Sequence, residues 1–78
     1  MDSKTVFALR KEAQSLSGIE KLNKLNEALG IARNLYSEEP YNEWNQKAFA
    51  WVLIDLCKYY IADNNLNQAE TCLGELNT

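Results

Sequence analysis

Apolar residues recur at steps of three and four along nearly the whole chain, and this spacing restricts its fold more than any other feature. An α-helix brings residues at such steps onto one face, whereas a half-buried strand needs strict alternation. The 78 residues include one proline, Pro40, and 46% of them are hydrophobic. A chain of this length is a single domain near the lower size limit for folding without disulfides or metals. The sequence therefore predicts one all-α domain.

Four helices are predicted, at about residues 3–16, 19–37, 43–62 and 66–77. Ser17-Gly18, Pro40 and Asn64-Asn65 interrupt the periodicity, and such short connections favour two antiparallel helical hairpins. Ser17 and Glu20 have the spacing of a capping box, and Asn42 and Asn65 are expected to be N-caps. In the first helix the residues expected to face away from the core are Lys4, Arg10, Lys11 and Gln14.

The third predicted helix carries two apolar stripes, which is typical of a helix packed between others. The first stripe consists of Phe49, Leu53, Leu56 and Tyr60, and the second of Trp44, Ala48, Trp51, Asp55 and Ala62. Asp55 and Lys58 interrupt this helix at a spacing of three. They form either a partly buried ion pair with each other or simply the strip of the helix that reaches water.

From Ala50 onward the chain resembles the tetratricopeptide-repeat family of helical hairpins. Leu56, Tyr60, Ala69 and Leu73 stand at the spacing of that family's packing positions, with Asn64 in place of the turn glycine. Ala28, Ala32, Leu35 and Pro40 match the second half of a preceding unit. Ala28 and Ala69 are 41 residues apart instead of 34, and the first helix lacks the family's tryptophan, leucine and glycine. The resemblance covers the last two thirds of the chain and implies right-handed stacking of the two hairpins.

Members of this family are mostly protein-binding scaffolds whose first helices line a groove. The resemblance implies a partner-binding set on the third helix, with Ala62 at its far end: Trp44, Lys47, Trp51, Ile54 and Lys58. Trp44 and Trp51 are seven residues apart on one face. They are either anchors for a partner or large packing residues over the first helix, and both interpretations remain open at this point.

Charge is distributed unevenly along the chain. Up to Leu35 there are six basic and four acidic residues, and beyond it two basic and seven acidic residues. This asymmetry would attract a basic partner to the second half, unless the charges are ordinary solvated helix faces. No cluster of basic residues is dense enough to neutralise several phosphates, so no nucleic-acid partner is expected.

The sequence contains no histidine, no glycine-rich phosphate loop and no nucleophile motif. We therefore expect no enzymatic activity, no catalytic residue and no cofactor. Cys57 and Cys72 fall on consecutive helices and could approach each other in the core. Two thiolates without histidine do not complete a four-ligand zinc site, so buried packing is expected and no metal is predicted.

The N-terminus leads directly into an amphipathic pattern rather than a signal peptide, which favours a cytoplasmic protein with reduced thiols. The apolar stretch from Ala48 to Ala62 is too short for a membrane span and contains two charges. No membrane partner is expected.

These features together favour a protein–protein interaction module, or scaffold, that docks a segment of another protein on the third helix. The alternative is a homodimerisation domain that uses the same face. Repeat units normally need about three copies to bury their faces. We therefore also expect the chain to be the N-terminal part of a longer protein.

Overall fold

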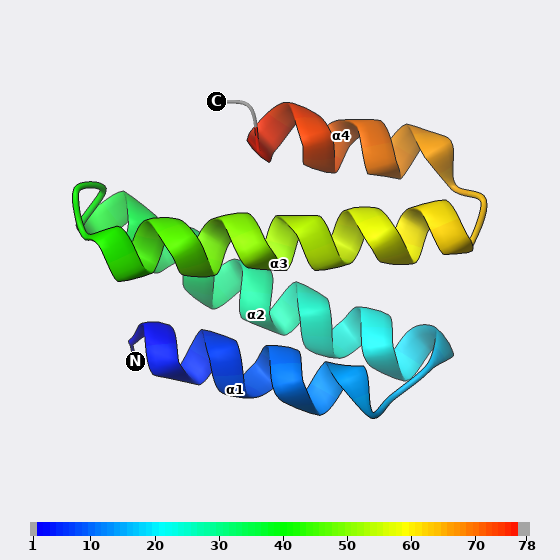
Figure 1. The fold of residues 1–78 in the computed structure, drawn as a ribbon, viewed down its shortest axis with the longest axis horizontal. Helices are drawn as coiled ribbons and strands as arrows, with labels where there is room; N and C mark the ends of the chain where they lie inside the picture. Colours follow the sequence, from blue (N-terminus) through cyan, green and yellow to red (C-terminus); the bar gives the residue numbers. More distant parts are fainter. Residues whose placement is uncertain (1, 77–78) are drawn as a thin grey trace.

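The computed structural model describes residues 2–76, which form four α-helices and no strand (Figure 1). The helices are α1 (Ser3–Gln14), α2 (Gly18–Glu38), α3 (Glu43–Ala62) and α4 (Leu66–Leu76). The all-α prediction is confirmed. The first helix ends two residues earlier than predicted, and the predicted end of the last helix, at residue 77, lies outside the described residues.

Helix N-termini are capped where the sequence has an asparagine or aspartate. The Asn42 side chain accepts a hydrogen bond from the backbone N–H of Asn45 at 3.1 Å, and that of Asn65 accepts one from Gln68 at 3.3 Å. Asp2 caps α1 in the same way. The predicted capping box at Ser17 is wrong, because its side chain makes no capping hydrogen bond. The next residue, Gly18, has φ +60°, and this left-handed backbone departs from the regular first turn that a capping box needs.

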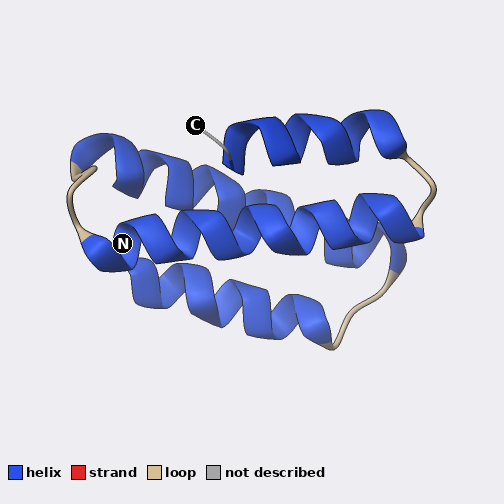
Figure 2. Ribbon diagram, turned by 45° about the horizontal axis from the view of Figure 1, so that its top comes forward, coloured by secondary structure: helices blue, strands red, loops and turns tan. Residues whose placement is uncertain are grey.

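α3 is the central helix, in contact with α1, α2 and α4, while α1 also pairs with α2 (Figures 1 and 2). The Cα atoms span 34 × 26 × 14 Å, so the molecule is a slab about two helices deep. The largest fully buried side chains come from three helices and form the centre of the core: Val6, Leu25, Val52, Leu53 and Leu56.

The apolar residues of α4 recur at steps of three and four, at Leu66, Ala69, Leu73 and Leu76, and only some of them are buried against the rest of the protein. Ala69 and Cys72 are buried, but Leu66 and Leu73 are 61% and 45% exposed. The apolar surface of α4 is therefore wider than the part of α4 that contacts α3. Two large apolar side chains of α4 therefore remain at the surface.

Polar contacts fix the neighbouring helices relative to one another. Asn45 is buried, and its side-chain amide donates to the Leu35 carbonyl near the end of α2 at 3.2 Å. Arg33 of α2 forms a bidentate ion pair with Glu75 of α4, at 2.6 and 2.7 Å. The first interaction gives a hydrogen-bond donor to a carbonyl in the last turn of α2, and the second links the side chains of α2 and α4.

Two glycines of α2 predict opposite responses to the same substitution. Gly18→Ala is expected to lower the free energy of unfolding by about 1–2 kcal/mol, because φ +60° brings a Cβ too close to the following carbonyl oxygen. Gly30→Ala is expected to raise it by about 1 kcal/mol, since Gly30 lies inside the helix where a Cβ meets no atom within 4 Å. Thermal or urea denaturation of both variants checks this. A stabilised Gly18→Ala protein would contradict the left-handed turn.

Candidate functional site

Aromatic and cationic side chains of α1 and α3 meet in one connected group, which we call the α1–α3 face: Phe7, Arg10, Trp44, Lys47 and Trp51. The Phe7 and Trp44 rings pack edge to face with their centroids 6.5 Å apart. The Lys47 ammonium lies 5.0 Å from the centre of the Trp44 ring, and the Arg10 guanidinium lies 5.2 Å from that of Trp51. Such cation–π contacts hold rings in place without covering them completely.

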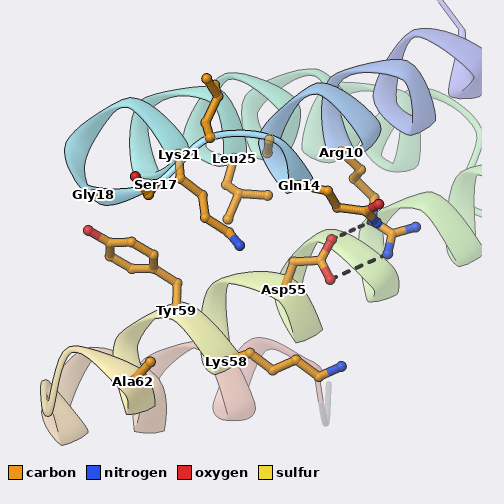
Figure 3. A pocket seen from close by; sticks show the side chains of 12 residues that line it. Arg10, Gln14, Ser17, Gly18, Lys21, Leu25, Asp55, Lys58, Tyr59 and Ala62 are labelled. Atoms are coloured by element: carbon orange, nitrogen blue, oxygen red, sulfur yellow. Dashed lines mark hydrogen bonds and ion pairs between the residues drawn. The ribbon is translucent and has the colours of Figure 1, made fainter.

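Arg10 connects this face to the protein beneath it. Its Nε atom donates to Asp55 Oδ2 at 2.5 Å and its Nη2 atom to Oδ1 at 3.3 Å, as the dashed lines in Figure 3 show. Only 17% of the Arg10 side chain and 20% of the Asp55 side chain are exposed. The expectation that Arg10 faces away from the core is therefore wrong. Of the two interpretations of Asp55 and Lys58, the ion pair between them is not formed, because Asp55 pairs with Arg10. A lysine three residues along the same helix does not offer a carboxylate the bidentate fork that arginine does.

Neither tryptophan belongs to the core. Trp44 is 62% exposed and Trp51 is 46% exposed, although each contacts a residue of α1. Each tryptophan thus packs in part against the first helix, while a large part of its surface still faces solvent. Exposed tryptophans held by neighbouring side chains are typical of interface anchors.

A cleft of about 320 Å³ lies beside this face, between the α1–α2 turn and the second half of α3 (Figure 3). We call it the α1–α3 cleft. Arg10, Lys21 and Lys58 are the basic residues of its lining, and Ala13, Leu16, Leu25, Tyr59 and Ala62 are among its apolar and aromatic residues. Lys21 reaches from α2 toward α3 in Figure 3. Neither Lys21 nor Lys58 forms an ion pair with any residue between 2 and 76.

The structure brings most, but not all, of the predicted binding residues together. Trp44, Lys47 and Trp51 belong to the α1–α3 face, and Lys58 lies at the cleft beside it. Ile54 is half-buried and contributes to neither.

Sequence reasoning missed both contributions of α1 to this face. Phe7 and Arg10 stand three residues apart, beside the apolar stripe rather than in it.

A second cleft, of about 240 Å³, lies between α2, α3 and α4. The Tyr36 and Phe49 rings pack against each other there, with centroids 5.3 Å apart. Gln46 and Glu75 are the polar side chains of its lining, and it holds no lysine or arginine. This cleft is less charged than the α1–α3 cleft and lies on other helices.

Cys57 and Cys72 lie side by side in the core, as predicted, and both are free thiols. The Cys57 thiol donates to the Ala69 carbonyl at 3.3 Å. Burial, followed by the neighbouring Cys57, raises the pKa of the Cys72 thiol above its ordinary value of 9.0. Among residues 2–76, no three histidine, cysteine or acidic side chains gather where they could hold a metal ion.

The raised pKa of Cys72 predicts a loss of stability at alkaline pH. The unfolded chain ionises this thiol before the folded protein does, so stability is complete below pH 9.0 and falls as the pH rises through the folded pKa. Cys72→Ala is expected to make this decline shallower above about pH 9 in denaturation curves. Burial also raises the pKa of Tyr60, from 10.0, so Tyr60→Phe, as the control, should affect only the more alkaline part. Parallel curves for Cys72→Ala and the parent protein would contradict the prediction.

Within residues 2–76, none of the helices combines the length and the apolar character that a membrane crossing requires. Comparison of the chain with protein-family models, curated proteins and solved structures found no match. The functional argument therefore rests on the geometry and chemistry of the α1–α3 face and its cleft.

Proposed function

We propose that the chain is a protein–protein interaction module that docks a segment of another protein across the α1–α3 face. The observation that carries the proposal is the pair of exposed tryptophans, Trp44 and Trp51, each fixed by a neighbouring aromatic or cationic side chain. Such anchors are already ordered before binding, so less side-chain freedom is lost when a partner covers them. The proposal assigns no catalytic step to the protein.

The arrangement of the helices supports a tetratricopeptide-like form for this module. α3 contacts both helices of the first hairpin, and α4 contacts α3. This is what two stacked hairpins with α1 and α3 on a shared face would require. A cytoplasmic scaffold is part of the same proposal, because buried free thiols persist in reducing compartments.

Homodimerisation is the second candidate. The sequence pattern predicts it on the docking face of the third helix, whereas the exposed apolar side chains that favour it in the structure form a separate set. Ile61, Leu66 and Leu73 are 55%, 61% and 45% exposed near the α3–α4 edge. A two-fold dimer would bury them against their copies. The mass in solution, measured by light scattering across a concentration series, tests this candidate: a concentration-dependent dimer supports it, and a monomer at every concentration counts against it.

The docking proposal is tested by selecting peptides from a random display library on the whole chain. Binding of the selected peptides is followed by intrinsic fluorescence, because the only two tryptophans both lie on the face. Trp51→Ala is expected to weaken binding by about 30-fold or more, as for an interface hot spot. Leu66→Ala is the matched control: it removes an equally exposed large apolar side chain from α4.

Two outcomes would count against docking at this face. One is a library from which no peptide is enriched. The other is a set of peptides that bind Trp51→Ala as tightly as the parent protein, or that lose affinity equally with Leu66→Ala. Thermal unfolding of each variant shows whether it is folded under the binding conditions.

A further inference from the structure

We propose that the segment docked on the α1–α3 face is acidic, and that one of its carboxylate side chains enters the α1–α3 cleft. This inference rests on the proposed function, since it names the chemistry of the partner for the same face. The inference rests on two neighbouring features: Trp51, an exposed apolar anchor, and a cleft lined by two unpaired lysines. The Arg10 side chain contacts the Trp51 ring and also lines the cleft.

The cations at this part of the surface exceed the acids. Arg10 is neutralised by Asp55, and Lys47 lies 3.6 Å from Glu43 in an exposed contact. Lys21 and Lys58, by contrast, have no acidic partner between residues 2 and 76. Lys4, which lies beside Phe7 and Trp44, has none either.

This local positive charge stands against a net charge of −3 for the whole chain. The charge asymmetry along the sequence favours a basic partner only if the acidic residues of the second half gather on one surface. Charge counts along the sequence do not show where the helices place these residues. The excess of acids in the second half of the chain includes Asp63, Glu70 and Glu75, none of which lines the α1–α3 cleft. Electrostatic complementarity at the cleft therefore favours an acidic segment.

The lining of the cleft matches a carboxylate on an apolar stem. Leu25, Ala13 and Ala62 give it apolar walls, and the side chains of Lys21 and Lys58 line it, with the Lys21 ammonium extending between α2 and α3 in Figure 3. A glutamate side chain places two methylene groups before its carboxylate, so it can contact both. The Arg10–Asp55 pair is already satisfied, and it is expected to border the bound carboxylate rather than exchange partners.

The two subsites lie at a distance that one short segment spans. Trp51 and Lys58 are seven residues apart on α3, which corresponds to about 10 Å along the helix axis. An extended peptide covers about 10 Å in three residues. A segment with a large apolar side chain and an acidic residue about three positions apart would therefore reach the tryptophan and the cleft together.

The test uses the peptides selected on the whole chain, first for their composition and then for their binding. The expected peptides are rich in glutamate or aspartate near a large apolar residue. Lys21→Gln combined with Lys58→Gln is expected to weaken their binding at least about tenfold and to reduce its dependence on salt between about 50 and 500 mM NaCl. Lys11→Gln is the matched control, because Lys11 is an exposed lysine of α1 that does not line the cleft.

A glutamine-for-glutamate exchange in the selected peptide provides the second half of a double-mutant cycle. If the carboxylate enters the cleft, this exchange weakens binding to the parent protein but has little further effect on the double lysine variant. A thymidine oligonucleotide tests whether any polyanion binds, and an affinity equal to that of the peptides would overturn the proposal.

Failure of this inference differs visibly from failure of the proposed function. Peptides that need Trp51 but are neutral or basic, or that bind the double lysine variant unchanged, would overturn the acidic segment and leave docking in place. Loss of all Trp51-dependent binding would remove both. Unfolding curves of the double lysine variant confirm that it is folded, since both lysines lie at the surface of the cleft rather than in the core.

Discussion

Replacing Leu56 by alanine is expected to lower the free energy of unfolding by about 2–5 kcal/mol. Leu56 is 1% exposed and lies on the buried side of α3, the helix that contacts all three others. The substitution removes buried apolar surface and leaves a cavity that the surrounding helices close only in part. A domain of this size is stable by only a few kcal/mol, so a large fraction of the molecules is expected to be unfolded at room temperature. Urea or thermal denaturation followed by circular dichroism measures the loss.

Leu73→Ala is the matched control for this prediction. It is the same chemical change in the neighbouring helix, at a side chain that is 45% exposed. Its expected cost is below about 1 kcal/mol, because much of the removed surface already contacts water. A cost below about 1 kcal/mol for Leu56→Ala would mean that the inward face of α3 is assigned incorrectly.

Replacing Ala48 by leucine is expected to lower the free energy of unfolding by about 1–3 kcal/mol, through excess volume instead of a cavity. Ala48 is 0% exposed, on the side of α3 that belongs to the core. Ala28 and Ala32 of α2 are also completely buried. Small residues at these positions allow close approach of the helices, and three additional carbon atoms force them apart or distort the new side chain.

Ala50→Leu tests the same change two residues along the same helix. Ala50 is half-buried and lines the cleft of about 240 Å³ between α2, α3 and α4, so a larger side chain has space there. Little or no loss of stability is expected. Equal destabilisation by the two substitutions in chemical denaturation would argue that helix propensity, rather than packing, determines the effect at Ala48.

Secondary structure was accessible from the sequence because its determinants are local. The bounds of α3 match the prediction at both ends, where Asn42 caps the first turn and Asn64 adopts the left-handed φ of +60° that breaks the helix. The error at Ser17 is also local in origin. The spacing of Ser17 and Glu20 predicts a capping box, but the positive φ of the adjacent Gly18 prevents the regular first turn that the box needs.

The candidate site was predicted only in part. Periodicity places Trp44 and Trp51 on one face of α3, but it does not show how much of each ring a neighbouring helix covers. The structure leaves 62% and 46% of them exposed. Phe7 and Arg10 escaped prediction because their importance depends on residues 37 to 45 positions away in the sequence. No local pattern contains that information.

The sequence by itself determined four helices, the caps at Asn42 and Asn65 and the set of residues able to form a core, since these follow from spacing, propensity and turn chemistry within a few residues. Only the tertiary structure decided which charges meet. It paired Asp55 with Arg10 and brought Lys21 of α2 and Lys58 of α3 to the lining of one cleft, where neither lysine has an acidic partner among the described residues. The physical reason is that electrostatic energy depends on distance through space, and the packing of α1 and α2 against α3 fixes that distance.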